Sequence, residues 1–237
     1  MDRGELLYEG KAKRVYRTAD PTLLIQHFKD DATAFNAQKR GTIAGKGVVN
    51  NRVSEVLFDL LEHHGVATHL VRRLSDRDML VRACQIVKLE VVVRNVVAGS
   101  LATRLGRPEG EPVPEPIVEH YLKDDALGDP LVNDWHIRFL QLATPEDLGT
   151  INATAVRVND ILRAFLAARD IVLVDFKLEF GRHQGRLLVA DEIGPDTCRL
   201  WDASTGRKLD KDRFRRDLGA VEEAYEEVGR RICGMAA

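Results

Sequence analysis

One ten-residue segment, Ile171–Phe180, places charged side chains at every second position of an otherwise apolar run. Because successive side chains of a β-strand point to opposite faces, Asp175, Lys177 and Glu179 would lie together on one face. The other face would be apolar throughout. A strand with this pattern is expected to cover a hydrophobic core with one face and to present two carboxylates and an ammonium group from the other.

The segment that follows, Arg186–Ile193, predicts a second strand that returns antiparallel to the first. If the turn between them takes five residues, Phe180 pairs with the first residue of the second strand, and Asp191 lies opposite Asp175. Glu179 then shares their face. A shift of one residue would send Asp191 to the opposite face, so the grouping of these three carboxylates depends on the register.

Carboxylates that face one another across a sheet repel, and the repulsion needs a counter-charge. Lys177 offsets one negative charge. A divalent cation suits the remainder, because Mg²⁺ in proteins binds one or two carboxylates together with the phosphates of a ligand. A solvated polar face on an edge hairpin explains the same alternation about equally well. The pattern by itself therefore leaves both interpretations open.

Gly10, Lys11, Ala12 and Lys13 connect two predicted strands and could cover the phosphates of a nucleotide. A glycine lets the backbone approach a ligand closely, and the two lysines add positive charge. On spacing alone, however, a basic hairpin turn is the more common explanation.

Two further segments contain residues that are suited to anions. Gly45, Lys46 and Gly47 precede a predicted helix, but the glycine spacing and Gly47 itself do not match a P-loop. They could hold an anion at the helix N-terminus or form a flexible start to the helix. Arg94 lies toward the end of an apolar strand, and a Gly-Ser turn follows it, which suits a phosphate or carboxylate ligand. For this residue alone, however, a surface salt bridge is the more common explanation.

These candidate residues are distributed over two predicted lobes. The first is rich in strands and contains one helix, Gly47–His64, whose apolar positions have helical spacing. The second begins with an apolar, β-branched strand, Leu89–Val97, and continues with a proline-rich loop at Pro108–Pro116. A helix starts with the N-cap Thr144, and a closing helix runs from about Asp212 with Phe214, Leu218, Val221, Tyr225, Val228 and Ile232 on one face. Strands and helices do not alternate regularly, so the predicted fold class is α+β, with lobes at residues 1–83 and 84–237.

The composition excludes several classes of protein. The 237 residues include 35 Lys and Arg against 37 Asp and Glu, without the basic excess of a dedicated nucleic-acid binder, so no nucleic-acid partner is expected. No apolar run approaches the roughly 18 residues of a membrane span, and the N-terminus lacks an apolar signal segment. We therefore expect no membrane partner and a cytoplasmic location. The three cysteines without a C-x-x-C pair argue against a disulfide scaffold and a zinc ribbon.

Several of these segments, taken in order, resemble those of the phosphoribosylaminoimidazole-succinocarboxamide synthase (SAICAR synthetase) family. The most specific are the D-x-K-L-E-F-G run that starts at Asp175 and the R-N-x-x-A-G-S run that starts at Arg94. The resemblance extends over nearly the whole chain and includes 7–13, 121–130, 190–196, 199–202 and 210–215. The sequence departs from the usual family pattern at Lys88, where proline is common, and at Gly194, where serine is common.

The resemblance implies an ATP-dependent ligase of purine biosynthesis. Such an enzyme uses ATP and Mg²⁺ to join L-aspartate to the carboxylate of carboxyaminoimidazole ribonucleotide, through an acyl phosphate. It implies a strand-rich N-terminal lobe similar to that of kinases and ATP-grasp enzymes, ATP in the cleft between the lobes, and a homodimer.

The resemblance also implies roles for individual residues. The nucleotide-binding set would be Gly10, Lys11, Ala12, Lys13, Arg82, Ile86 and Lys123. The metal ligands would be Glu179, Asp191 and Asp129, and the ribotide-binding set Arg94, Ser100, Arg199 and Arg215. Lys177 and Asp175 would be the catalytic residues.

Two other functions remain in competition. A small-molecule kinase would share the ATP and metal sites but would transfer phosphate to an acceptor hydroxyl. A nucleotide-binding module without catalytic activity would tolerate loss of the hairpin carboxylates, yet Asp175, Glu179 and Asp191 are all present. Whether ADP release requires L-aspartate distinguishes these functions.

Overall fold

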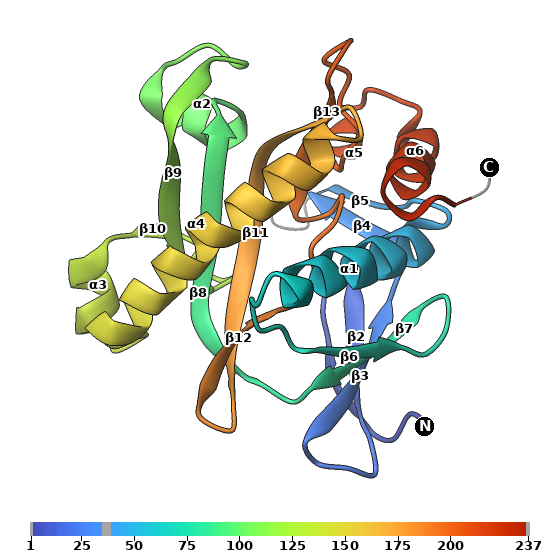
Figure 1. The fold of residues 1–237 in the computed structure, drawn as a ribbon, viewed down its shortest axis with the longest axis vertical. Coiled ribbons are helices and arrows are strands. Elements are labelled where there is room, and N and C mark those ends of the chain that lie inside the picture. The colour runs from blue at the N-terminus through green and yellow to red at the C-terminus, as the bar shows by residue number, and fades with distance from the viewer. Residues whose placement is uncertain (1, 35–38, 236–237) are drawn as a thin grey trace.

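The computed structural model describes residues 2–34 and 39–235, and its strands form two main antiparallel sheets (Figure 1). The first sheet is built from the beginning of the chain. Its five strands lie in the order β1 (Leu6–Glu9), β2 (Lys13–Arg17), β3 (Leu23–Phe28), β7 (Asp78–Arg82) and β6 (Leu70–Arg73).

The second sheet contains the long strands of the molecule. Its order is β10 (Leu131–Val132), β9 (Pro112–Leu122), β8 (Gln85–Val96), β11 (Ile171–His183) and β12 (Arg186–Ala190), with β13 (Cys198–Asp202) also paired to β11. A separate hairpin is formed by β4 (Asp31–Ala34) and β5 (Lys39–Thr42). With helices packed on these antiparallel sheets, the fold is α+β, as predicted.

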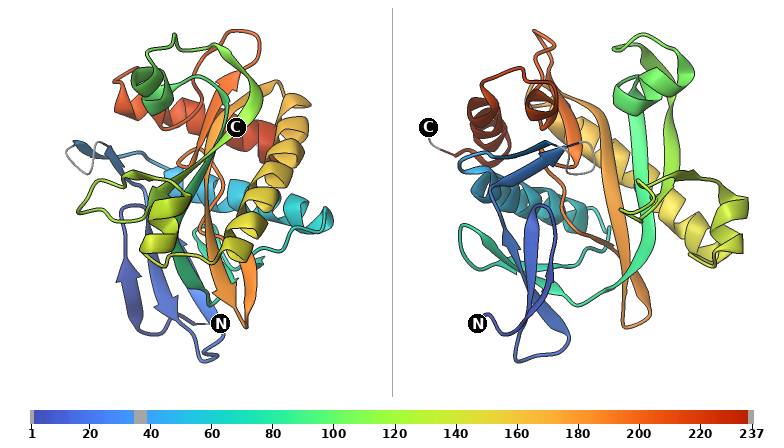
Figure 2. Two further views of the ribbon diagram at one scale, coloured as in Figure 1. Left: turned by 90° about the vertical axis from the view of Figure 1, so that its left-hand side faces the viewer. Right: turned by 180° about the vertical axis from the view of Figure 1, so that it is seen from behind.

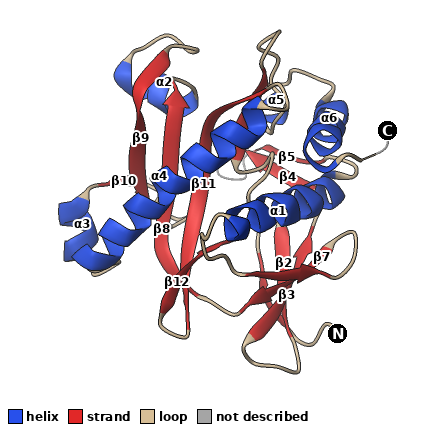
Figure 3. Ribbon diagram, viewed as in Figure 1, coloured by secondary structure: helices blue, strands red, loops and turns tan. Residues whose placement is uncertain are grey.

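The three longer helices are α1 (Lys46–His63), α4 (Pro145–Ala167) and α6 (Val221–Cys233) (Figure 3); α1 and α4 pack on the sheets, and α6 packs on α1. Helix α4 crosses one face of the second sheet, and α1 contacts α4, α6 and the first sheet. The start of α4 is as predicted, with Thr144 as N-cap and Pro145 in the first turn. Three short helices complete the fold: α2 (Gly99–Leu105), α3 (Asp134–Phe139) and α5 (Asp212–Arg215).

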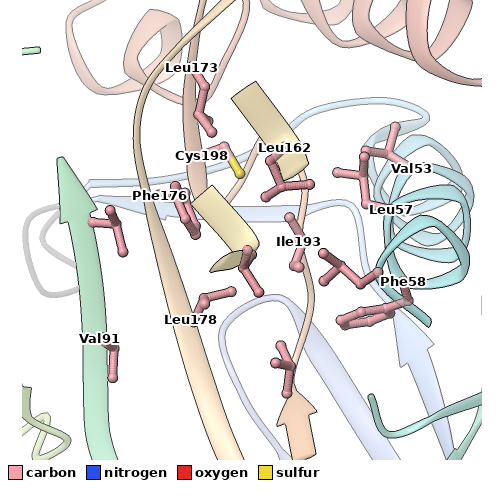
Figure 4. Packing of buried hydrophobic residues seen from close by; sticks show 14 of the residues in the cluster. Val53, Leu57, Phe58, Val91, Leu162, Leu173, Phe176, Leu178, Ile193 and Cys198 are labelled. Atoms are coloured by element: carbon pink, nitrogen blue, oxygen red, sulfur yellow. The ribbon is translucent and has the colours of Figure 1, made fainter. Parts of the chain in front are cut away.

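A continuous hydrophobic core joins the two sheets through the helices (Figure 4). Leu57 and Phe58 of α1, Leu162 of α4, and Phe176 and Leu178 of β11 are all buried in it. The core therefore takes up the apolar face of β11 and leaves the polar face of that strand on the opposite side of the sheet.

The predicted register of the hairpin is wrong by three residues. Phe180 pairs with Val189, and the strands meet in a two-residue turn at Gln184 and Gly185, whose φ angles are 49° and 81°. Two left-handed residues are typical of a tight hairpin turn, which extends β11 to His183. Asp191 therefore does not pair with Asp175; it lies just beyond β12.

The expected loop at Pro108–Pro116 is also wrong in part, because β9 begins at Pro112. β10 pairs with β9 only at His120 and Tyr121, so the proline-containing part of β9 has one unpaired edge. Proline lacks an N–H group and is tolerated at such an edge.

The predicted closing helix is interrupted between α5 and α6. Asp217, Gly219 and Ala220 all have positive φ angles, which a helix does not allow. Leu218 is consequently 45% exposed and does not share the buried face of α6.

Candidate active site

A cavity of about 410 Å³ lies on the polar side of β8 and β11. The loop between β1 and β2 borders it, as do the segment after β12 and helix α5. Figure 2 shows the β1–β2 hairpin and the two long strands from behind. Thirteen predicted site residues line the cavity: Gly10, Lys11, Ala12, Lys13, Arg94, Lys123, Asp129, Asp175, Lys177, Glu179, Asp191, Arg199 and Arg215.

The floor of the cavity is a double row of side chains from β8 and β11. The register places Glu179 opposite Glu90 and Asp175 opposite Arg94. Lys177 lies between these pairs, with its Nζ atom 2.9 Å from Glu90 Oε1 and 2.7 Å from Glu179 Oε1. The ammonium group thereby neutralises two carboxylates that would otherwise repel across the strands.

Asp191 approaches the same lysine from the segment after β12. Its Oδ2 lies 3.9 Å from Lys177 Nζ, and its Oδ1 accepts a short hydrogen bond from Lys13. Burial opposes the charge of Asp191, but Lys13 and Lys177 together hold its pKa well below the usual range. The residue has a φ angle of 66°, and Gln26 donates a hydrogen bond of 3.3 Å to its carbonyl oxygen. The side chain is thus an ionised carboxylate that faces the cavity.

A loop at residues 123–129 closes one side of the cavity. Lys123 Nζ lies 2.6 Å from Glu179 Oε1, and Lys11 Nζ lies 2.7 Å from Asp125 Oδ1. Asp129 Oδ1 accepts a hydrogen bond from the backbone N–H of residue 124. This loop therefore brings a second lysine to Glu179 and contacts the β1–β2 loop.

Two arginines define the other end of the cavity. Arg94 Nη1 lies 2.9 Å from Asp175 Oδ2, and Arg199 Nη1 contacts both oxygens of Asp175 at 2.8 and 3.1 Å. Arg199 Nε donates to Asp212, and Arg94 Nη2 donates to Ser100 Oγ at 3.1 Å. Burial opposes the charge of Arg199, but its two carboxylate partners raise its pKa. Both guanidinium groups are therefore cations held in fixed positions in the wall of the cavity.

A glycine makes the position of Arg199 possible. Gly99 has a φ angle of 51°, and a Cβ atom on it would lie 2.3 Å from Arg199 Nη2. The glycine of the R-N-x-x-A-G-S run is thus required both for its backbone conformation and for the space that the arginine fills.

Three predicted site residues lie elsewhere. The guanidinium group of Arg82 donates to the carbonyl oxygens of Thr68 and Leu70, away from this cavity. Ile86 is 40% exposed near the start of β8. Ser100 meets the cavity only through Arg94.

The structure also places residues at the cavity that the sequence reasoning did not select. Glu90, Glu192, Asp196 and Lys211 all line it. Glu90 could have been found, because it lies four positions before Arg94 and therefore on the same face of the predicted strand. The other three follow irregular segments, for which no periodicity predicts a direction.

Asp196 is the centre of a buried cluster at the back of the cavity. Its Oδ2 lies 2.8 Å from Lys46 Nζ, and its Oδ1 accepts a hydrogen bond of 2.6 Å from Tyr225. Burial opposes the charge of Asp196, but the nearby ammonium group of Lys211, together with Lys46 and Tyr225, holds its pKa far below the usual range. Lys46 thus takes part in an internal ion pair. At the N-terminus of α1, the carboxylate of Asp30 accepts a hydrogen bond of 2.9 Å from the N–H of Gly47.

The carboxylates fit a magnesium ion only together with a ligand. Within residues 2–34 and 39–235, no three His, Cys, Asp or Glu side chains gather into a metal site. Glu179 and Asp191 nevertheless both face the cavity beside Lys177, and hard carboxylate oxygens of this kind suit Mg²⁺ when phosphates supply further oxygens. Asp129 is hydrogen-bonded to the backbone of its own loop, so it is the weakest candidate of the predicted three.

Comparison with known proteins agrees with this geometry. The sequence profile of the SAICAR synthetase family matches residues 6–232. The chain belongs to the SAICAR synthetase family. This membership makes it a ligase of purine biosynthesis. It is 58% identical over 236 residues to the phosphoribosylaminoimidazole-succinocarboxamide synthase of Novosphingobium aromaticivorans, with 98% of this chain and 90% of the relative covered.

Solved SAICAR synthetases have the same fold. The enzyme from Ehrlichia chaffeensis superposes with a TM-score of 0.95 at 44% identity and covers 98% of this chain and 100% of its own. A SAICAR synthetase in complex with ADP also has a TM-score of 0.95, at 49% identity, with 98% and 99% covered. Within the described residues, no helix has the length and apolar character needed to cross a membrane.

The two departures from the usual SAICAR synthetase pattern lie beside the site and not in it. The side chain of Lys88 is exposed on β8, and its carbonyl oxygen accepts from the N–H of Lys123 at 3.2 Å. Gly194 lies near Asn50, in the buried layer behind the cavity. Both positions leave the charged side chains of the cavity unaltered.

Proposed function

We propose that the protein uses ATP to form an amide between L-aspartate and the carboxylate of carboxyaminoimidazole ribonucleotide, giving SAICAR, ADP and phosphate. The observation that carries this proposal is the arrangement along β11. One end of the cavity, around Glu179, is lined by lysines and carboxylates, and we call it the lysine and carboxylate end. The other end, around Asp175 on the same strand, is lined by arginines, and we call it the arginine end. A triphosphate at the first end and a ribotide at the second would meet over Lys177.

The lysine and carboxylate end suits the phosphates of ATP. Gly10, Lys11, Ala12 and Lys13 border it as one loop, and Lys123 faces it from the opposite side. A SAICAR synthetase of the same fold has been solved in complex with ADP, which supports nucleotide binding by this protein. For the adenine we propose the connection from Arg82 to Ile86, which joins the two sheets.

Glu179 and Asp191 would hold Mg²⁺ against these phosphates, with Asp129 as a more distant ligand. The ion supplies positive charge that neutralises the phosphate oxygens. Lys177, already fixed between Glu90 and Glu179, is placed to stabilise negative charge that develops in the centre of the cavity.

The arginine end suits the phosphate of the ribotide. Arg199 and Arg94 are oriented by buried carboxylates, so a phosphate would not need to order them. Ser100 and Arg215 complete this proposed set, because Ser100 bonds to Arg94 and Arg215 lines the cavity.

The proposed reaction has two steps. An oxygen of the ribotide carboxylate attacks the terminal phosphorus of ATP, and the bond from that phosphorus to ADP breaks. The amine nitrogen of L-aspartate then attacks the acyl carbon, and phosphate leaves with the oxygen that joined it to that carbon. The amine loses a proton, which passes to solvent. The protein contributes position and fixed charge to both steps.

We extend the proposal to the surroundings of the site. Residues 1–83 and 84–237 would act as two lobes with ATP in the cleft between them, and the enzyme would work as a cytoplasmic homodimer. The family resemblance supports this extension, and analytical ultracentrifugation of the purified protein tests the oligomeric state.

Isotope transfer tests the proposed chemistry. With both carboxylate oxygens of the ribotide labelled with ¹⁸O, each turnover should deliver one labelled oxygen to inorganic phosphate and leave one in the amide product. Phosphate without label, at full yield of product, would contradict the acyl phosphate.

A further inference from the structure

The two ends of the cavity leave one cation without an assigned ligand. Lys211 lines the cavity on the segment that starts α5, and its side chain is 12% exposed. It lies beside Asp196, which also lines the cavity. Neither the phosphates of ATP nor the proposed ribotide set uses it.

The backbone of Lys211 is held in place from both sides. Its N–H donates to the carbonyl oxygen of Pro195 at 3.1 Å, and its own carbonyl oxygen accepts from the N–H of Arg215 at 3.0 Å. The lysine is therefore anchored to the same segment that carries Asp196. Its ammonium group reaches the cavity from a fixed point.

The ion pair of Lys211 with Asp196 is longer than that of Lys46 with the same carboxylate. Asp196 already has Lys46 at 2.8 Å and the hydroxyl group of Tyr225 at 2.6 Å. Lys211 Nζ lies 3.5 Å from Asp196 Oδ2, and no other ion pair of this lysine is found in the described part of the chain. Two ammonium groups thus share one carboxylate, and the one at the longer distance faces the cavity.

The second substrate of the proposed reaction contains groups that such a cation can bind. L-Aspartate brings two carboxylates to a centre where a third carboxylate and the phosphates of ATP already lie. Each carboxylate needs a cation or several donors once water is displaced. The cations at either end of the cavity are taken up by phosphates in the proposed function, so the carboxylates of the amine substrate need a separate partner.

We infer that Lys211 binds one carboxylate of the amino-acid substrate and thereby positions its amine between the two ends of the cavity. This inference rests on the proposed function, since it names the residue that recognises the second substrate. Removal of the charge should lower the stability but leave the protein folded, because Asp196 keeps Lys46 and Tyr225 as partners.

Steady-state kinetics of Lys211→Met test this inference. Loss of a charge-assisted contact should raise the KM for L-aspartate roughly ten- to a hundred-fold and leave the KM for ATP and for the ribotide within about twofold. Lys211→Arg, which keeps the charge, should recover part of the loss. Lys208→Met serves as a matched control, because Lys208 pairs with Glu109 outside the cavity and should leave all three KM values unchanged.

Substrate analogues separate recognition from a general structural effect. L-Asparagine and the α-amide of L-aspartate each lack one carboxylate. Because Lys211 is proposed to bind only one of the two carboxylates, one of these analogues already lacks the group that it contacts. For that analogue, kcat/KM should be nearly the same in the wild type and in Lys211→Met. An equal decrease for L-aspartate and both analogues would overturn the inference, as would a change confined to the ribotide.

Measurements on the wild type separate a failure of the proposed function from a failure of the role assigned to Lys211. If ADP release by the wild type does not depend on L-aspartate, the proposed function fails and the inference fails with it. If the wild type requires L-aspartate but Lys211→Met and Lys211→Arg, both folded, leave its KM unchanged, only the role of Lys211 is refuted.

Discussion

Glu90 and Glu179 face each other directly across β8 and β11, and the ammonium group of Lys177 lies within 3 Å of both carboxylates. Like charges in this position destabilise a sheet unless a counter-ion is present. Lys177 thus links the stability of the strand pair to the charge pattern of the cavity. Function and fold depend on the same side chain.

Lys177→Met should therefore affect both properties. Loss of a partner from a largely buried ion network costs about 3 kcal/mol, so we expect a decrease of this size in the free energy of unfolding. The kcat should fall by roughly a hundred-fold or more, because a fixed charge at the reacting centre is lost. Adding Glu90→Gln to this variant should restore about 1 kcal/mol of stability without restoring activity. Further destabilisation by Glu90→Gln would contradict the bridging role.

Asp191→Asn should greatly reduce turnover and leave the protein folded. The variant removes one of the proposed metal ligands, while Lys13 keeps Glu192 as a partner at 3.0 Å. Circular dichroism and thermal unfolding should stay close to the wild type, and kcat should fall by roughly a hundred-fold or more. Asp217→Asn is the control, since Asp217 is an exposed partner of Lys39. A folded Asp191→Asn protein with normal activity would refute the metal assignment.

Gly99→Ala should raise the KM for the ribotide. The added Cβ atom would displace Arg199, which the proposal assigns to the ribotide phosphate. Gly106→Ala is a matched control at the end of the same helix, because Gly106 has a similar φ angle of 61° but nothing within 4 Å of a Cβ atom. Both variants should lose about 1 kcal/mol of stability from the backbone, but only Gly99→Ala should bind the ribotide at least roughly ten-fold more weakly. Equal kinetics of the two variants would show that Arg199 does not bind this substrate.

The sequence predicts the composition of the site better than its geometry. Alternation along Ile171–Phe180 identifies Asp175, Lys177 and Glu179 as one polar face, and the structure places all three at the cavity. Periodicity predicts a face, because it depends only on local backbone geometry. It does not predict which other strand lies opposite, and the neighbours Glu90 and Arg94 come from about 85 residues earlier in the chain.

The errors in the predicted fold also have local physical causes. The hairpin register depended on the turn, and Gln184 adopts a left-handed conformation that is uncommon for this residue type. The strand that begins at Pro112 forms because this part of β9 has an unpaired edge, and the sequence does not reveal where a sheet ends. The break before α6 rests on the left-handed Asp217, Gly219 and Ala220, and of these only the glycine is a strong sequence signal.

The pH dependence of stability should report on Asp210. Burial and the neighbouring Asp212 raise the pKa of Asp210 to about 7, although backbone N–H groups from residues 212 and 200 oppose this. A raised carboxyl pKa means that the folded state holds a proton that the unfolded chain releases near pH 4. Its contribution to stability is therefore present at low pH and is lost as pH rises from about 4 to 7.

Asp210→Asn removes this titration. Between pH 5 and pH 8, the free energy of unfolding of the wild type should decrease by about 3 kcal/mol relative to that of the variant. Urea unfolding at the two pH values measures it. A difference that does not change with pH would show that Asp210 has an ordinary pKa.

Gly194→Ser should stabilise the protein. A Cβ atom at residue 194 would lie 3.5 Å from Asn50 Oδ1 in ordinary contact, and both polar atoms of the Asn50 amide lack a hydrogen bond within the described residues. The serine hydroxyl could donate to this amide. We expect a gain of about 1 to 2 kcal/mol from the hydrogen bond and the reduced freedom of the unfolded chain. Gly194→Ala reduces the freedom of the unfolded chain but adds no hydrogen bond, so it should be less stable than Gly194→Ser. The reverse order of stability would refute a hydrogen bond between the serine and Asn50.

The most direct test of the ligase function is ADP release in the presence of Mg-ATP, carboxyaminoimidazole ribonucleotide and L-aspartate, with each component omitted in turn. We predict that release requires all three, and that product absorbance rises with ADP in a ratio of about one. ADP release that continues at the full rate without L-aspartate, with a phosphorylated acceptor as product, would instead identify a small-molecule kinase. A folded protein that binds ATP and releases no ADP under any of these conditions would contradict the assignment as a ligase and favour a nucleotide-binding module.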